Sequence, residues 1–107
     1  MIAHRRPACG GTPPTVMCIG GLDPAGCAGL AADLHAVKAL GAHGLPVVAA
    51  VTAQDTRRVV AVAPVARRLL GAQLDAVLGD IPVRAVKIGM LASAPVASAV
   101  AAGALAS

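Results

Sequence analysis

Residues 16–34 read VMCIGGLDPAGCAGLAADL, from Val16 to Leu34. The first four residues form an apolar run, which predicts a strand buried on both faces. The glycine-rich stretch from Gly20 to Cys27 predicts a turn. From Ala28 to Leu40, apolar residues recur at helical spacing and Gly41 provides a helix stop. A strand, a loop and a helix in this order begin a parallel α/β unit.

Strands and helices continue to alternate along the rest of the chain. We predict strands over Val47–Val51, Val59–Val62 and Ala85–Ile88, a helix from Pro64 to about Leu78, and a final helix capped by Ser93 with Pro95 in its first turn. In the helices, the residues expected to face inward are Leu30, Leu34, Val37, Leu40, Leu70, Leu74, Val77 and Leu78. The class is therefore α/β, with a mostly parallel sheet and flanking helices. Residues 1–14 are rich in proline and glycine and predict a disordered leader, so residues 15–107 form the domain.

The composition excludes several classes of protein. The chain has 107 residues, is 57% hydrophobic and contains 26 alanines and 14 valines but no aromatic residue. This hydrophobicity excludes disorder of the whole chain, and the missing aromatics argue against modules that stack nucleic-acid bases. The net charge of +4 is carried by scattered arginine pairs rather than a basic stripe, so we expect no nucleic-acid partner.

The ends and the cysteines indicate a cytoplasmic protein. Residues 88–107 carry no charge, but glycine, proline and serine interrupt them, which favours a strand end, a turn and a buried helix over a membrane span. No secretory segment is predicted. The three cysteines lack C-x-x-C spacing, so neither a disulfide framework nor a zinc site is indicated, and we predict no metal ligands.

The loop after the first strand satisfies only half of a phosphate-binding motif. Gly21 to Gly26 fits G-x-x-x-x-G, but Cys27 and Ala28 stand where a P-loop has Lys and Ser or Thr. The glycines either let a ligand approach the backbone at a strand end or only permit a tight turn. Asp33, Gln54, Lys87 and Met90 also lie near predicted strand ends, although taken singly each has an ordinary structural interpretation. A Gln amide offers a donor and an acceptor side by side, which suits an aminopyrimidine edge, and a carboxylate accepts from a hydroxyl or amine.

Four segments resemble the hydroxymethylpyrimidine/phosphomethylpyrimidine kinases of thiamine biosynthesis, which belong to the ribokinase-like superfamily. They are GGLDPAGCAGLAADL at 20–34, ALGAHG at 39–44, TAQDT at 52–56 and KIGML at 87–91. The resemblance implies ATP-dependent phosphorylation of 4-amino-5-hydroxymethyl-2-methylpyrimidine and then of its monophosphate, with ATP and Mg²⁺ as cofactors. It implies a substrate pocket built by Gly21, Ala28, Asp33, Thr52, Gln54 and Met90. Asp33 would hold the hydroxymethyl group, Gln54 would read the ring edge, and Met90 and the Thr52 methyl would pack against the ring.

The chain departs from the family pattern at Ala25, Cys27, Ala31 and Asp55, where the family has Ser, Gly, Gln and Asn. We expect Cys27 to add bulk beside the pocket and Asp55 to add negative charge near a phosphorylated substrate. Family members are more than twice as long, with their nucleotide site and anion hole in the second half. The resemblance therefore implies an amino-terminal portion of a ribokinase-like domain, without catalytic residues and inactive alone, whose full-length relatives form homodimers. The alternatives are a non-catalytic pyrimidine-binding module and a fragment of a pyridoxal-type kinase.

Overall fold

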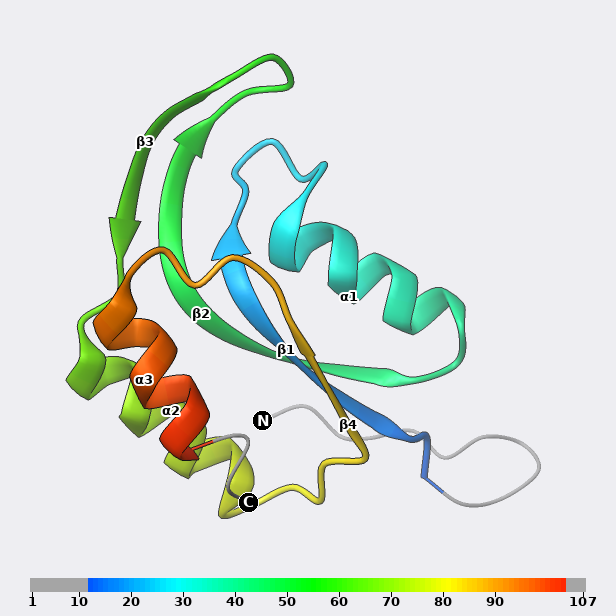
Figure 1. The fold of residues 1–107 in the computed structure, drawn as a ribbon. Coiled ribbons are helices and arrows are strands. Elements are labelled where there is room, and N and C mark those ends of the chain that lie inside the picture. Colours follow the sequence, from blue (N-terminus) through cyan, green and yellow to red (C-terminus); the bar gives the residue numbers. More distant parts are fainter. Residues whose placement is uncertain (1–11, 104–107) are drawn as a thin grey trace.

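The computed structural model describes residues 12–103, whose strands and helices alternate (Figure 1). In chain order the elements are β1 (Thr15–Leu22), α1 (Gly29–Ala39), β2 (His43–Gln54), β3 (Val59–Pro64), α2 (Arg67–Leu78), β4 (Ala85–Ile88) and α3 (Ala94–Gly103). The strands form one sheet in the order β3-β2-β1-β4. Strand β1 pairs in parallel with β2 and β4, whereas β3 runs antiparallel to β2. The predicted α/β class with a mostly parallel sheet is confirmed. Most of the predicted leader, residues 1–11, lies outside the described residues.

The helices cover both faces of the sheet. Helix α1 packs against β1 and β2 on one face, while α2 and α3 lie side by side on the other (Figure 1). Alternate side chains of β1 and β2 point toward α2 and α3, as the period of two in a strand requires. They form the main core with those helices, namely Met17, Ile19, Leu45, Val47, Ala49, Leu70, Leu74, Val96 and Val100. The inward positions predicted for the second helix are confirmed, because Val77 and Leu78 pack against this core too.

Two residues let the helices lie close to β2. Gly44 has no side chain, and a Cβ built there would lie 2.5 Å from Cδ2 of Leu34, so α1 packs directly on the strand backbone. On the opposite side, the amide of Gln73 in α2 bonds the backbone of Val48 twice. Its Oε1 accepts from the Val48 N–H at 2.8 Å, and its Nε2 donates to the Val48 carbonyl at 2.9 Å. Since β3 pairs with β2 only from Ala50 onward, Gln73 serves the strand edge that β3 leaves open.

The predictions for four residues are wrong, namely Gly20, Gly21, Pro64 and Leu40. Gly20 and Gly21 belong to β1 rather than to the turn, because the strand continues through them with a register shift against β2. Pro64 ends β3 opposite Ala50 instead of starting α2, since a proline without an N–H is tolerated on an edge strand. Leu40 is 86% exposed because it is the C-cap of α1, beyond the last helical turn. The predicted stop at Gly41 is confirmed by its φ of +83°.

Strand β2 is longer than predicted, and Val51 is half exposed rather than buried. From Ala50 onward β2 leaves the layer of helices and pairs with β3, forming a two-stranded arm of residues 50–64 (Figure 1). The predicted cap of the last helix is confirmed, because the Ser93 hydroxyl accepts from the Val96 N–H at 3.2 Å. Among residues 12–103, no helix is long and apolar enough to cross a membrane.

Candidate functional site

A hollow of about 290 Å³ lies where the carboxyl ends of β1, β2 and β4 meet the start of α1. Ligands of open α/β sheets bind in this position. The six residues predicted from the sequence all line it, namely Gly21, Ala28, Asp33, Thr52, Gln54 and Met90. The hollow is completed by residues outside that predicted set, namely Gly20, Asp23, Gly29, Lys87 and Gly89. The topology therefore brings together residues that are 69 positions apart, from Gly21 to Met90.

Asp23 fixes the loop that forms one wall of the hollow. Its buried carboxylate accepts three backbone N–H bonds, from Ala25 at 2.8 Å, from Cys27 at 3.0 Å and from Ala28 at 2.9 Å. These bonds offset the cost of burying the charge and leave the loop one defined conformation. The sequence carried a signal for this role, since an Asp-Pro pair directly after a strand favours an Asx turn.

The glycines of this wall are required by close contacts. Gly29 has a φ of +58°, and a Cβ built on it would collide with the Gly21 carbonyl oxygen. At Gly21 a Cβ would lie 2.8 Å from Cε of Met90 and 3.8 Å from Cγ2 of Thr52. Two methyl groups thus flank the bare backbone of Gly21 and form an apolar surface inside the hollow.

Asp33 and Lys87 form an ion pair across the opposite wall. Oδ2 of Asp33 lies 2.9 Å from Nζ of Lys87, and the two side chains are 18% and 50% exposed. A pair this open to water stabilises a fold by at most about 1 kcal/mol, so its main effect is to hold the two charges at the hollow. Cys18 lies next to Lys87 in the sheet register. Burial, and to a lesser degree the Asp33 charge, raises the pKa of the Cys18 thiol, against a smaller opposing effect of Lys87.

Thr52 and Gln54 form the third wall, both on the same side of β2. Oγ1 of Thr52 lies 2.9 Å from the Leu22 carbonyl oxygen and 2.8 Å from Oε1 of Gln54. Thr52 is buried, whereas Gln54 is partly exposed at the rim. The hollow therefore presents a carboxylate, an ammonium, an amide and an apolar surface to one small molecule, which is the composition of a site for a polar ring.

The positions that depart from the family pattern lie away from this hollow. Cys27 is exposed and does not itself line the hollow, because its backbone N–H bonds Asp23 and its thiol contacts the Ala25 carbonyl. It precedes the lining residue Ala28, and its effect on the pocket stays a prediction. Asp55 lies at the tip of the arm, where its carboxylate accepts from the N–H groups of Arg57 and Arg58 at 2.8 and 2.9 Å. These two bonds lower the pKa of Asp55. Asp55 therefore shapes the turn and is not a lining residue.

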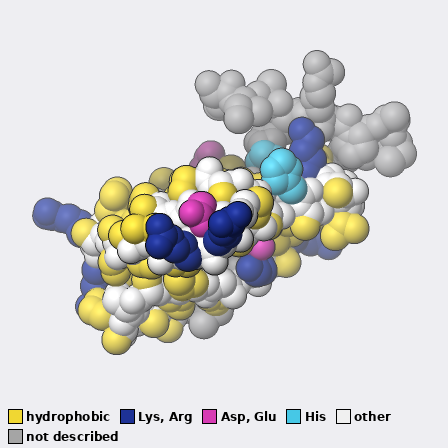
Figure 2. Space-filling view, turned by 90° about the horizontal axis from the view of Figure 1, so that it is seen from above, with side chains coloured by type: hydrophobic (Ala, Val, Ile, Leu, Met, Phe, Trp, Pro, Cys, Tyr) yellow, Lys and Arg dark blue, Asp and Glu magenta, His cyan; other side chains and the backbone are white. Residues whose placement is uncertain are grey.

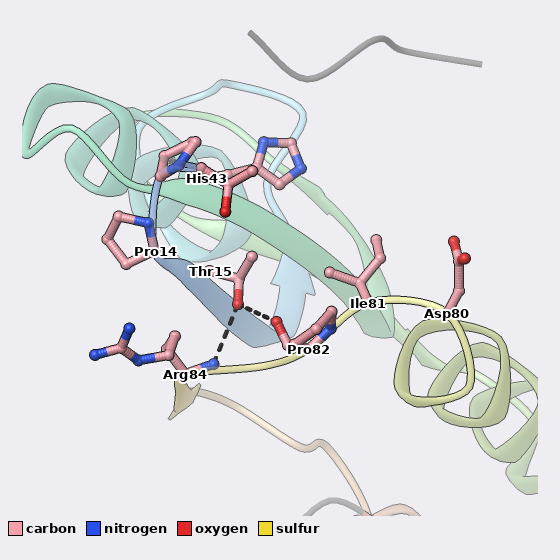
Figure 3. Close-up of a pocket in the computed structure, with 9 residues that line it drawn as sticks. Pro14, Thr15, His43, Asp80, Ile81, Pro82 and Arg84 are labelled. Carbon is pink, nitrogen blue, oxygen red and sulfur yellow. Dashed lines mark hydrogen bonds between the residues drawn. The ribbon is translucent and has the colours of Figure 1, made fainter. Parts of the chain in front are cut away.

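A second hollow, of about 460 Å³, lies at the opposite end of the strands, near the starts of β1 and β2 (Figure 3). The hydrogen bonds drawn in Figure 3 join two chain segments. The Thr15 hydroxyl donates to the Pro82 carbonyl and accepts from the Arg84 N–H at 3.1 Å. These bonds tie the start of β1 to the segment before β4. None of the predicted site residues lines this hollow.

The distribution of charged and metal-ligating side chains bears on whether the chain has a nucleic-acid surface or a metal site. On the face shown in Figure 2, basic side chains form separate groups among hydrophobic ones. Within residues 12–103, no group of three or more His, Cys, Asp or Glu side chains is arranged to hold a metal ion.

Comparisons with known proteins agree on one family. The profile of the family described as phosphomethylpyrimidine kinase matches residues 23–106. A hydroxymethylpyrimidine/phosphomethylpyrimidine kinase of Rhizobium meliloti is 47% identical over 85 residues, which cover 79% of this chain and 32% of that protein. The chain spans about a third of the length of the curated relatives it matches.

The fold is also that of solved vitamin kinases. The crystal structure of phosphomethylpyrimidine kinase from Clostridium difficile superposes with a TM-score of 0.82 at 39% identity, covering 89% of this chain and 41% of that one. Pyridoxal kinase from Staphylococcus aureus in complex with pyridoxal gives a TM-score of 0.80 at 28% identity, covering 91% and 37%. The predicted partial kinase domain is confirmed.

Proposed function

This chain belongs to the phosphomethylpyrimidine kinase family, and on that premise we propose that its hollow binds the pyrimidine substrate of an ATP-dependent kinase. The substrates are 4-amino-5-hydroxymethyl-2-methylpyrimidine and its monophosphate, in thiamine biosynthesis. One observation supports this most strongly. The six residues expected to contact the pyrimidine lie around a single hollow at the carboxyl end of the sheet, although they come from three separate stretches of the chain, 21–33, 52–54 and 90.

Asp33 orients the acceptor group in this proposal. Its carboxylate accepts a hydrogen bond from the substrate hydroxymethyl group and so directs the hydroxyl oxygen toward the phosphoryl donor. Lys87, 2.9 Å from Asp33, holds that carboxylate in place. Its half-exposed ammonium also pairs with the phosphate when the monophosphate is bound.

The other walls bind the ring. Gln54 hydrogen-bonds the ring edge from the rim of β2, while the methyl groups of Met90 and Thr52 pack on the ring face beside Gly21. Because Gly21 has no side chain, the flat ring can lie close to the strand backbone. Ala28 adds a small side chain at the base of α1.

ATP and Mg²⁺ are the cofactors that this proposal requires, and they would supply the phosphoryl group and neutralise its charge. The described residues do not fit them. The loop after β1 has Cys27 and Ala28 where a P-loop has Lys and Ser or Thr, and residues 12–103 contain no group of three or more His, Cys, Asp or Glu side chains placed to hold a metal ion. We therefore assign this chain the binding of the acceptor substrate, and we expect the purified chain alone to show no ATP-dependent phosphorylation of the pyrimidine.

Ligand-induced thermal stabilisation of the purified chain tests the proposal. Saturating hydroxymethylpyrimidine should raise the melting temperature, because the ligand binds only the folded state. Asp33→Asn should weaken binding about tenfold or more, since a hydrogen bond to a charged group contributes about 1.5–3 kcal/mol. The matched control is Asp75→Asn on the exposed side of α2, which should bind like the parent. No shift at saturating pyrimidine would reject the proposal.

A pyridoxal-type kinase is the weaker candidate, because the pyridoxal complex superposes with a TM-score of 0.80 at 28% identity, against 0.82 at 39% for phosphomethylpyrimidine kinase. The same assay separates the two. Pyridoxal should give a smaller shift than hydroxymethylpyrimidine at equal concentration, and a larger shift would reverse the assignment. The remaining alternative is a non-catalytic module, which would bind the pyrimidine without taking part in its phosphorylation.

A further inference from the structure

The Thr52 hydroxyl has two hydrogen-bond contacts but only one proton to donate. Its Oγ1 lies within hydrogen-bond distance of two oxygen positions, the Leu22 carbonyl at 2.9 Å and the Gln54 Oε1 position at 2.8 Å. A threonine hydroxyl has one proton and can donate to only one of them. The other pair would then be two acceptors in contact at the side of a buried residue, which is unfavourable.

One arrangement gives each contact a proton. The Leu22 carbonyl can only accept, so Thr52 donates to it. A half turn of the Gln54 amide exchanges its oxygen and nitrogen, and the Nε2 group then donates to Oγ1 of Thr52. We infer that Thr52 is a positioning residue, which holds the Gln54 amide with Nε2 toward Thr52 and Oε1 toward the hollow.

This orientation sets what Gln54 recognises, and here the inference rests on the proposed function. With Oε1 facing the hollow, Gln54 accepts a hydrogen bond, so the ring edge it reads must carry an N–H donor. A 4-amino substituent supplies one, whereas a 4-oxo group in the same place offers only an acceptor. Thr52 therefore makes the site selective for the amino form of the pyrimidine, without its own hydroxyl touching the ring.

The orientation can be measured without any ligand, which separates it from the proposed function. We suggest ¹⁵N-edited NMR of the full 107-residue chain, with two variants. Thr52→Val keeps the branched shape but removes the hydroxyl, and Thr52→Ser keeps the hydroxyl but removes the methyl group. In the parent and in Thr52→Ser, the Gln54 side-chain NH₂ protons should show nuclear Overhauser contacts to residue 52.

In Thr52→Val, the shifts of these NH₂ protons should move toward those of a freely rotating amide, and their exchange with water should become faster. The inference is overturned if the parent shows no such contacts, or if Thr52→Val leaves shifts and exchange unchanged. Should Thr52→Val fail to fold, the contacts in the parent and in Thr52→Ser decide the question alone.

Calorimetric titration tests the consequence for specificity. The parent and Thr52→Ser should bind the 4-amino pyrimidine at least about tenfold more tightly than its 4-oxo analogue, because the oxo form leaves a polar pair unmatched. In Thr52→Val, this ratio should fall to about threefold or less. Equal affinities in the parent would overturn the specificity role. If the parent binds neither ring, the proposed function fails, and the NMR result still decides the orientation.

Discussion

The two central strands and the two edge strands of the sheet differ sharply in their surroundings. In β1 and β2, Met17, Ile19, Val47 and Ala49 are fully buried against helices. By contrast, every residue of β3 and β4 is exposed, including large apolar side chains. Both kinds of strand nevertheless contribute to the hollow, because Thr52 and Gly21 come from the centre and Lys87 from the β4 edge.

The site therefore has one wall on buried central strands and another on an exposed edge strand. The central strands are apolar on both faces, as in parallel sheets covered by helices, and the helices cover them. The edge strands carry the same kind of apolar residue, for example Val60 and Val86, without cover in this chain. The two edge strands therefore carry exposed apolar side chains, from which we expect a tendency to self-associate.

The largest expected effect follows from truncating a central strand. Ile19→Ala removes a fully buried side chain from the main core and should lower the free energy of unfolding by about 2–5 kcal/mol. Val60→Ala in β3, the matched change at an exposed edge, should change it by less than about 0.5 kcal/mol. Urea unfolding followed by circular dichroism measures both. Similar losses at the two positions would remove the distinction between centre and edge.

The second-largest effect concerns Val48 in β2, whose backbone N–H and carbonyl are hydrogen-bonded by the Gln73 side chain. Gln73→Leu leaves the N–H and the carbonyl of Val48 without their hydrogen bonds, which should cost about 1–3 kcal/mol. Hydrogen exchange at the Val48 amide should accelerate at least about tenfold. Asp75→Leu, two residues along α2 on its exposed side, is the control and should leave this amide protected. Unchanged protection in Gln73→Leu would show that α2 does not stabilise this edge.

The centre of the sheet could be predicted from the sequence, whereas its edges could not. Val16–Ile19 is apolar throughout because it is covered on both faces, and this local pattern identifies a central strand. The bonds from Gln73 to Val48 join residues 25 positions apart, and no local pattern in the sequence signals them. The prediction for Pro64 fails for a related reason, because its pairing with Ala50 depends on how β3 folds back along β2.

The candidate site shows the same division. The motif residues could be placed in one pocket because they follow strand ends, and parallel strand ends meet at one edge of a sheet. The sequence did not predict the Asp33–Lys87 contact, since it spans 54 positions and depends on the pairing of β4 with β1. Nor could it show that Cys27 and Asp55 do not line the hollow, because the hydrogen bonds of local backbone turns engage both residues.

A smaller effect is expected from the thiol in the central strand. Burial raises the pKa of Cys18 above its usual value of 9.0, so the folded state favours the neutral thiol. The stability that this provides is complete below about pH 9 and is lost as pH rises through the folded pKa. Cys18→Ala should flatten the decline of the free energy of unfolding as the pH rises above about 9, measured by urea titration at a series of pH values. Cys27→Ala, at the exposed thiol, should leave that decline as in the parent.

The smallest change in stability is expected from charges placed on the edge strands, where association rather than folding should respond. Val60→Lys in β3 and Val86→Lys in β4 place a charge on exposed apolar positions. Both should leave the free energy of unfolding within about 0.5 kcal/mol of the parent. Light scattering at increasing protein concentration should nevertheless show less association, because a lysine on an edge strand opposes pairing with another chain. The control is Lys at Ala72, on the exposed side of α2, which adds the same charge away from the sheet. If Ala72→Lys reduces association equally, net charge rather than the open strand edges causes the self-association.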